Sequence, residues 1–293
     1  MGAEVAKIGE DLNKTQVEAE VALIVHYPSR WTVAIGRYPD REVDPAFEAA
    51  GYHDELHRTN YSTDVVDPTR PLDKYRLVIA PRLWMVDDEA AANLEQYVKS
   101  GGTLVLTAGS GVTDQYGVSF DTPRPGPLAE LAGIEVSDIA WDKDRRETLS
   151  SDCITTLGGA GALCPWDEIH VTDAEVLATY GSGWRKGSPA ITRNTYGKGQ
   201  VIYIGSRLDS DALRPVVHWL CTETGAKPVL KTPDGVRAYE RRGESESFLF
   251  LINYTDAVQN IDLPESWRDA LGTESLGAVE IEPVDVRILR KAL

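Results

Sequence analysis

Residues 74–111 read KYRLVIAPRLWMVDDEAAANLEQYVKSGGTLVLTAGSG and predict a strand, a helix and a second strand. The apolar run Leu77–Ala80 has the length of a strand that is buried on both faces. Asp87 is placed to cap the following helix, which the glycines at 101–102 end before a second apolar run, Thr103–Thr107. Because a helical crossover covers a sheet face with apolar side chains, this block predicts a parallel βαβ unit.

The amino-acid sequence of this block resembles the trimerisation module of family 42 β-galactosidases. That module carries a tyrosine, an apolar run and Ala-Pro before a helix that ends in Tyr-Val and two glycines. The resemblance continues over most of the chain, through Thr107, Ser110, Gly111 and Asp114, then Pro125–Leu128, Leu131–Ile134, Ala178–Tyr180, Pro189–Asn194, Tyr196–Gly199 and Phe248–Asn253.

The remaining pattern predicts an α/β fold followed by a small all-β domain. Strands at Val21–Val25 and Asp64–Val66 interleave with a helix that opens at Pro45, which favours a doubly wound, mostly parallel sheet. The fold resembles that of flavodoxin and the class I glutamine amidotransferases. We expect a linker helix at 1–18, an amidotransferase-like trimerisation domain at 19–226 and a C-terminal β-sandwich domain at 227–293, the linker being the remnant of a barrel end if the resemblance holds.

The resemblance implies a non-catalytic assembly region, a homotrimer and a parent enzyme that hydrolyses terminal β-D-galactosides. The family's catalytic barrel and its two glutamates have no matching positions in these 293 residues, so no catalytic residue is carried over. The resemblance therefore implies that this region has a catalytic barrel as its partner, either in the same chain or in another chain. The alternative is an independent domain of amidotransferase-like fold that binds a small molecule or acts as a serine hydrolase.

Three residues are candidates for a functional site. Ser110 follows a buried strand in Ala108-Gly109-Ser110-Gly111, which is close to a nucleophile elbow, although Ala108 breaks the G-x-S-x-G pattern. In that pattern Ser110 is the alternative nucleophile, and a small residue in a glycine turn is the simpler interpretation. Trp31 and Trp184 fall in or near loops, where aromatic side chains stack on sugars or anchor protein interfaces, and the resemblance makes them candidates for a sugar-side or interface contact.

Composition excludes several classes of protein. The net charge of −16 disfavours nucleic acid and anionic membranes as partners, and no apolar run approaches the length of a transmembrane helix. The cysteines at 153, 164 and 221 are odd in number and lack a C-x-x-C spacing, so we expect reduced thiols, no metal and no cofactor. Reduced thiols and the absence of a secretory signal at the N-terminus predict a cytoplasmic protein.

Overall fold

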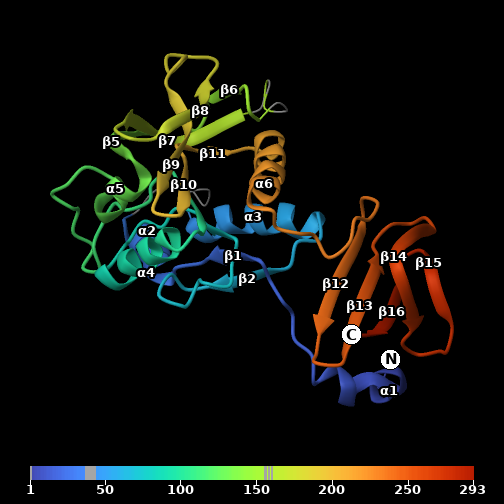
Figure 1. The fold of residues 1–293 in the computed structure, drawn as a ribbon. Helices are drawn as coiled ribbons and strands as arrows, with labels where there is room; N and C mark the ends of the chain where they lie inside the picture. Colours follow the sequence, from blue (N-terminus) through green and yellow to red (C-terminus); the bar gives the residue numbers. More distant parts are fainter. Residues whose placement is uncertain (1, 37–43, 155–156, 158, 160) are drawn as a thin grey trace. The chain divides into compact units, whose positions relative to one another are not determined.

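The computed structural model describes residues 2–36, 44–154, 157, 159 and 161–293. The chain divides into two compact units, each of which has its own sheet (Figure 1). The larger unit consists of Val21–Glu55 and Thr63–Ala226. The smaller unit consists of Met1–Glu20, Leu56–Ser62 and Lys227–Leu293, so it is assembled from three separate stretches of chain.

One half of the larger sheet is parallel. Its strands are β1 (Val21–Ile24), β2 (Thr63–Val66), β3 (Leu77–Ala80), β4 (Thr103–Thr107) and β10 (Gly199–Ile204), in the spatial order β2-β1-β3-β4-β10. Every residue of β1, β3 and β4 is buried, as the continuous apolar runs predict for strands that are covered on both faces.

The other half of the larger sheet is antiparallel, so the expectation of a mostly parallel sheet is wrong. Six strands extend or flank the path beyond β10: β5 (Ile134–Ala140), β6 (Arg146–Ser150), β7 (Gly161–Val171), β8 (Glu175–Tyr180), β9 (Pro189–Tyr196) and β11 (Ser206–Leu208). Tight turns such as the one at Gly197, whose φ is +61°, join neighbouring strands antiparallel. The result is a mixed sheet of eleven strands.

Helices cover this sheet on both faces. The larger unit carries α2 (Tyr27–Ile35), most of α3 (Pro45–Arg58), α4 (Asp88–Lys99), η2 (Gly126–Leu128), α5 (Ala129–Ala132) and α6 (Ser210–Thr224). The crossover through α3 runs from β1 to β2, and the crossover through α4 runs in the opposite direction, from β3 to β4. Right-handed crossovers in opposite directions place α3 and α4 on opposite faces (Figure 1).

The predicted cap of α4 is confirmed, and α6 has a cap of the same kind. The Asp87 side chain accepts a hydrogen bond from the backbone N–H of Ala90 at 2.7 Å, and the Asp209 side chain accepts one from Ala212 at 3.0 Å. Each carboxylate satisfies a donor that the first helical turn leaves without a partner inside the helix. Each helix therefore begins directly after its capping aspartate.

The smaller unit is a single antiparallel sheet packed on one helix. Its strands are β12 (Val236–Arg242), β13 (Glu246–Asn253), β14 (Gln259–Asp269), β15 (Ser275–Ile281) and β16 (Val286–Ala292), in the order β12-β13-β16-β14-β15. One face buries a core that includes Leu251, Trp267 and Leu289, and on the other face Phe248 packs with Ile8 of α1 (Gly2–Leu12). Helix α1 thus covers the face where a sandwich would have its second sheet; all five strands belong to one sheet.

Asn253 is the last residue of β13, and its amide side chain makes hydrogen bonds that an apolar side chain could not make. Its side-chain amide donates to the carbonyls of Ala257, Ile281 and Glu282 at 2.8–3.1 Å. Its carbonyl oxygen accepts from the backbone N–H and the hydroxyl of Thr255 at 2.9 and 2.7 Å. One buried side chain therefore ties the loop after β13 to the end of β15.

Candidate functional site

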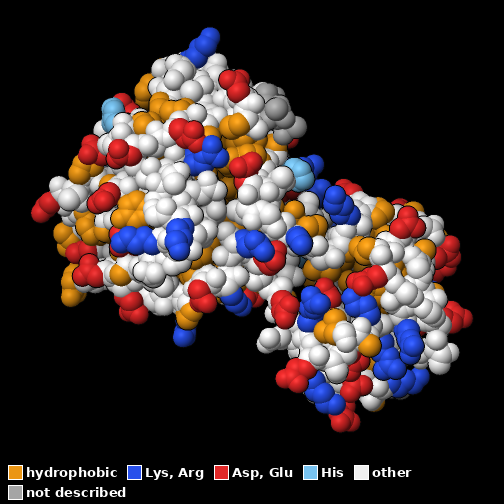
Figure 2. All heavy atoms as spheres, in the orientation of Figure 1, with side chains coloured by type: hydrophobic (Ala, Val, Ile, Leu, Met, Phe, Trp, Pro, Cys, Tyr) orange, Lys and Arg blue, Asp and Glu red, His pale blue; other side chains and the backbone are white. Residues whose placement is uncertain are grey.

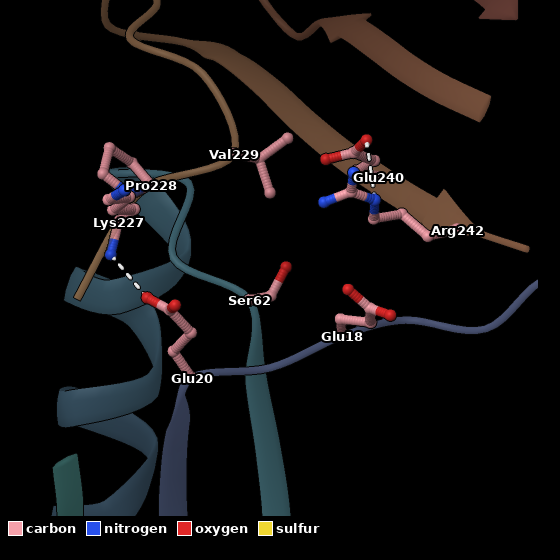
Figure 3. A pocket seen from close by; sticks show the side chains of 8 residues that line it. All are labelled: Glu18, Glu20, Ser62, Lys227, Pro228, Val229, Glu240 and Arg242. Atoms are coloured by element: carbon pink, nitrogen blue, oxygen red, sulfur yellow. Dashed lines mark hydrogen bonds and ion pairs between the residues drawn. The ribbon is translucent and has the colours of Figure 1, made fainter. Parts of the chain in front are cut away.

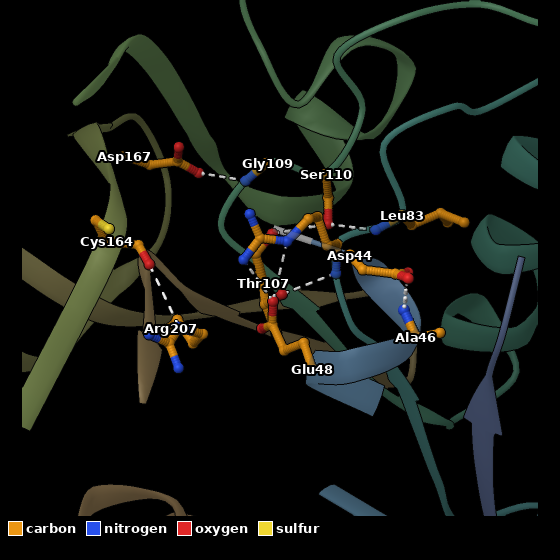
Figure 4. A network of polar contacts seen from close by, with 11 residues as sticks. Asp44, Ala46, Glu48, Leu83, Thr107, Gly109, Ser110, Cys164, Asp167 and Arg207 are labelled. Carbon is orange, nitrogen blue, oxygen red and sulfur yellow. Dashed lines mark hydrogen bonds and ion pairs between the residues drawn. The ribbon is translucent and has the colours of Figure 1, made fainter. Parts of the chain in front are cut away.

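The carboxyl ends of β3 and β4 hold a buried ion pair. Arg82 follows β3 and is 0% exposed, and its Nη2 and Nε atoms lie 2.8 and 3.1 Å from Oε2 of Glu48 on α3. The backbone N–H of Arg82 donates to the hydroxyl of Thr107 at the end of β4, at 2.8 Å. Figure 4 shows Glu48, Thr107 and Ser110 gathered at this edge of the sheet, which is where open α/β sheets commonly bind ligands. Here the protein's own side chains occupy it.

Ser110 lies in the turn after β4 and is 1% exposed. Its hydroxyl donates to the Thr107 carbonyl at 2.7 Å and accepts from the backbone N–H of Leu83 at 3.2 Å (Figure 4). Both functions of the hydroxyl are thus used within the fold, and none of its hydrogen bonds in the described chain goes to a histidine. The turn is tight as well: Gly111 has φ +62°, and a Cβ there would lie 2.0 Å from the Pro125 carbonyl oxygen.

Asp167 of β7 holds the same turn from the other side. Its Oδ2 atom accepts a hydrogen bond from the Gly109 backbone N–H at 3.1 Å (Figure 4). The same atom accepts a second hydrogen bond from the Tyr203 hydroxyl of β10, at 2.5 Å. The carboxyl group is buried, and burial raises its pKa from 3.8 to about 6, against the opposing effect of the two hydrogen bonds. Burial likewise raises the pKa of the Tyr203 hydroxyl. Asp167 joins the antiparallel half of the sheet to the turn that contains Ser110.

A second polar contact lies beyond the carboxyl end of β1. The Nδ1 atom of His26 is 2.9 Å from the hydroxyl of Ser29, and that hydroxyl also accepts from the Met85 backbone N–H at 2.9 Å. Both side chains are buried, and burial lowers the pKa of the His26 imidazole. The contact fastens α2 to the segment after β3.

Trp31 lies on α2 in a row of exposed apolar side chains. Tyr27, Trp31 and Ile35 follow one another at a spacing of four residues and are 55%, 61% and 80% exposed. The Tyr27 and Trp31 rings are 6.1 Å apart. Because residues four apart share one face of a helix, these three residues form a continuous apolar surface, the α2 stripe.

Trp184 lies between β8 and β9, far along the sheet from α2 (Figure 1). Its ring is 60% exposed and stacks on the Arg185 guanidinium at 3.7 Å. Arg185 itself is 4% exposed, and its guanidinium also lies 4.9 Å from the centroid of the Trp166 ring. Burial lowers the pKa of the guanidinium. The structure therefore does not bring the three candidate residues Trp31, Ser110 and Trp184 into one site.

The smaller unit has a polar pocket of about 260 Å³, which Figure 3 shows with its lining residues Glu18, Glu20, Ser62, Lys227, Pro228, Val229, Glu240 and Arg242. The backbone N–H of Lys227 donates to Oε2 of Glu20 at 3.0 Å, and Arg242 Nε lies 4.0 Å from Glu240 Oε1. Two of the three lining carboxylates, those of Glu20 and Glu240, therefore already interact with other residues of the pocket.

Over the residues that the structure describes, no group of three or more His, Cys, Asp or Glu side chains converges as metal ligands would. The cysteines at 153, 164 and 221 form no disulfide within the described ranges, and Cys221 is buried while Cys153 is exposed. No helix in the described ranges is long and apolar enough to span a membrane.

Comparison with known sequences identifies both units. The profile of the β-galactosidase trimerisation domain matches residues 19–226, and that of the β-galactosidase C-terminal domain matches residues 235–291. The chain belongs to glycoside hydrolase family 42. The resemblance that the sequence predicted is confirmed.

This family 42 chain is shorter than the relatives that it matches. It is 32% identical to the β-galactosidase BgaP of Planococcus sp. (strain L4) and 34% identical to the β-galactosidase Pbg of Clostridium perfringens, matching over 99% and 98% of its own length. The crystal structure of the β-galactosidase from Bacillus circulans sp. alkalophilus is similar with a TM-score of 0.94, at 32% identity over 99% of this chain. In each case the match spans 44% of the relative.

Sequence reasoning missed the buried charges of this family 42 chain. Arg82 and Glu48 lie 34 positions apart, and Asp167 lies 58 positions from Gly109, so no local spacing indicates either contact. One signal was present: Arg82 comes directly after an apolar strand and a proline, where a charged side chain needs a partner.

Proposed function

We propose that this chain is the non-catalytic assembly region of a family 42 β-galactosidase. In this proposal it joins three copies in a homotrimer and serves a catalytic barrel, in the same or another chain, that hydrolyses terminal β-D-galactosides. The observation that carries the proposal is the coverage by the two family profiles: the trimerisation profile matches 19–226 and the C-terminal profile 235–291.

The chemistry of the larger unit supports a non-catalytic role. A retaining glycosidase needs two carboxylates about 5–5.5 Å apart on either side of an open sugar site. The carboxylates of Glu48 and Asp167 are buried, and each is bonded to groups of the fold itself. They hold the ends of the strands in place, which is a structural task.

For Ser110 we propose a structural role in the turn after β4. The strand order β2-β1-β3-β4-β10 corresponds to the 2-1-3-4-5 order of flavodoxin-like sheets, and this supports a common origin with amidotransferase-like domains. In such a fold a nucleophile would stand exposed at this turn. The burial of Ser110 and its two internal hydrogen bonds favour structure over the alternative of a serine hydrolase.

For the assembly surface we propose two places on the larger unit. The α2 stripe exposes three large apolar side chains in a row, and the exposed ring of Trp184 stacks on Arg185. Tryptophan, tyrosine and arginine dominate the binding energy of protein interfaces. Trp31 and Trp184 are therefore proposed as interface contacts, and sugar contact is their alternative role.

For the location we propose the cytoplasm. The cysteines at 153, 164 and 221 form no disulfide in the described chain, and Cys221 is buried in α6. Free thiols persist in reducing compartments, and secreted proteins commonly oxidise them.

The test of the proposal is the turnover of nitrophenyl β-D-galactoside by the purified chain. We expect no rate above the uncatalysed one, because the family's two catalytic glutamates have no matching positions in this sequence. Turnover that co-purifies with the chain through a second column, and that Ser110→Ala abolishes, would overturn the proposal and support the hydrolase alternative.

A further inference from the structure

The smaller unit has a second pocket, on the face that α1 covers. Its volume is about 570 Å³, and it is lined by Asp11, Ser245, Glu246, Ser266, Arg268, Ser275, Arg290, Lys291 and Ala292. Neither family profile nor any relative's name assigns a ligand to this face. Basic side chains gather on the smaller unit among acidic ones, as Figure 2 shows for the visible face.

Strand register places two arginines side by side in this pocket. Arg290 of β16 lies directly opposite Phe248 of β13 and opposite Arg268 of β14, and Arg268 lies opposite Ser275 of β15. Residues directly opposite one another in an antiparallel pair point to the same face. The four side chains therefore form one row across four strands, on the side where Phe248 packs with Ile8 of α1.

No contact among the described residues accounts for the two neighbouring arginines. Like charges directly opposite in a sheet are destabilising. Within the described residues, neither guanidinium makes a hydrogen bond or an ion pair, whereas Arg146 in the larger unit lies 2.6 Å from the Asp209 carboxylate. The nearby Asp11 carboxylate already accepts from Lys14 at 3.2 Å. Arg268 is exposed and Arg290 is half-buried, so both guanidiniums are open to an anion from solution.

The other lining groups complete the donor set. The hydroxyls of Ser266 and Ser275 lie 2.6 Å apart, so one of them donates to the other and the second keeps its proton for a ligand. Lys291 is fixed by Glu265 at 2.5 Å and by the Trp267 ring at 4.7 Å, and it adds positive potential without being free to swing into the pocket. Guanidinium forks combined with hydroxyl donors suit an oxyanion.

We propose that Arg268 and Arg290 form the core of a binding site for a phosphate-type oxyanion. Donors that approach from two guanidiniums and from serine hydroxyls suit a tetrahedral anion better than a planar carboxylate. The pocket is larger than one phosphate ion, so the anion is either the free ion or the phosphoryl group of a larger ligand. This site is independent of the assembly function proposed above.

The experiment is calorimetric titration of the whole purified chain with inorganic phosphate at constant ionic strength. The wild type should bind saturably, and R268Q/R290Q should bind about tenfold to hundredfold more weakly, because charge-assisted hydrogen bonds are lost. The matched control is R287Q, three residues earlier on β16 and therefore on the opposite face, which should bind as the wild type does.

A second measurement guards against misfolding. Without phosphate, R268Q/R290Q should unfold at the same urea concentration as the wild type or a higher one, because the substitution removes a like-charge pair. A parallel titration with a hexose 6-phosphate identifies the source of the anion. Binding tighter than that of inorganic phosphate indicates a phosphorylated ligand, and equal or weaker binding indicates the free phosphate ion. The proposal is overturned if folded wild type shows no saturable binding, or if R287Q loses as much affinity as the double variant.

Discussion

Replacing Asp167 by asparagine should abolish one component of the pH dependence of stability. The carboxyl group is buried, and its pKa rises from 3.8 to about 6 on folding because of that burial. The folded protein therefore holds this proton more tightly than the unfolded chain does. The contribution of the group to stability is fully present below about pH 4 and is lost as the pH rises through about 6.

The magnitude follows from the size of the shift. A difference of about 2 pKa units corresponds to about 3 kcal/mol, since each unit is worth about 1.4 kcal/mol. Between about pH 4 and pH 7.5 the wild type should lose about 3 kcal/mol of stability relative to D167N. The asparagine cannot ionise, and its carbonyl oxygen can still accept from Gly109 or Tyr203, whose donors now contact Oδ2 of the aspartate.

The assay is urea unfolding followed by tryptophan fluorescence across this pH range. Six of the seven tryptophans lie in the larger unit, so the signal reports on the unit that contains Asp167. Asp121→Asn, at an exposed position of the same unit, is the matched control and should leave the pH profile parallel to that of the wild type. A stability difference between D167N and wild type that stays constant from about pH 4 to pH 7.5 would refute the reasoning.

Three further predictions concern the larger unit. Glu48→Ala leaves the Arg82 guanidinium buried without its carboxylate and should lower the free energy of unfolding by about 3–5 kcal/mol, while Glu95→Ala, which removes the exposed partner of Lys99, should change urea unfolding little. Ser110→Ala should lower it by about 1–3 kcal/mol, because the Leu83 N–H loses its acceptor, and a fluorophosphonate adduct on Ser110 of the wild type would contradict the structural role. Trp31→Ser should weaken trimer association about thirtyfold in sedimentation, as expected for an interface anchor worth about 2 kcal/mol, whereas Tyr254→Ser, at a similarly exposed aromatic of the smaller unit, should associate as the wild type does.

Local patterns in the sequence predict the parallel core and the order of the elements. The run Leu77–Ala80 is β3, Thr103–Thr107 is β4, and the helix between them begins after Asp87, each as expected. The small all-β domain expected at 227–293 contains the five strands of the smaller unit. These successes share a cause: apolar periodicity and caps act within a few residues of chain.

Long-range pairing is where the sequence is insufficient. The strand β7, Gly161–Val171, pairs with β5, β6 and β11, and these distant pairings build the outer part of the antiparallel half of the sheet. The single sheet of the smaller unit likewise depends on α1, more than 200 positions from the strands whose outer face it covers. Such contacts depend on tertiary packing, which local propensity does not encode.

The central claim is most directly tested by the mass of the purified chain in solution. Light scattering across a concentration series, at low and at about 0.15 M salt, separates intrinsic association from charge repulsion, since each copy carries −16 and the Debye length at the higher salt is about 8 Å. The account predicts three times the chain mass of 32.2 kDa, with association that strengthens as salt is added. A mass of one chain at every concentration and both salts would contradict the assembly function.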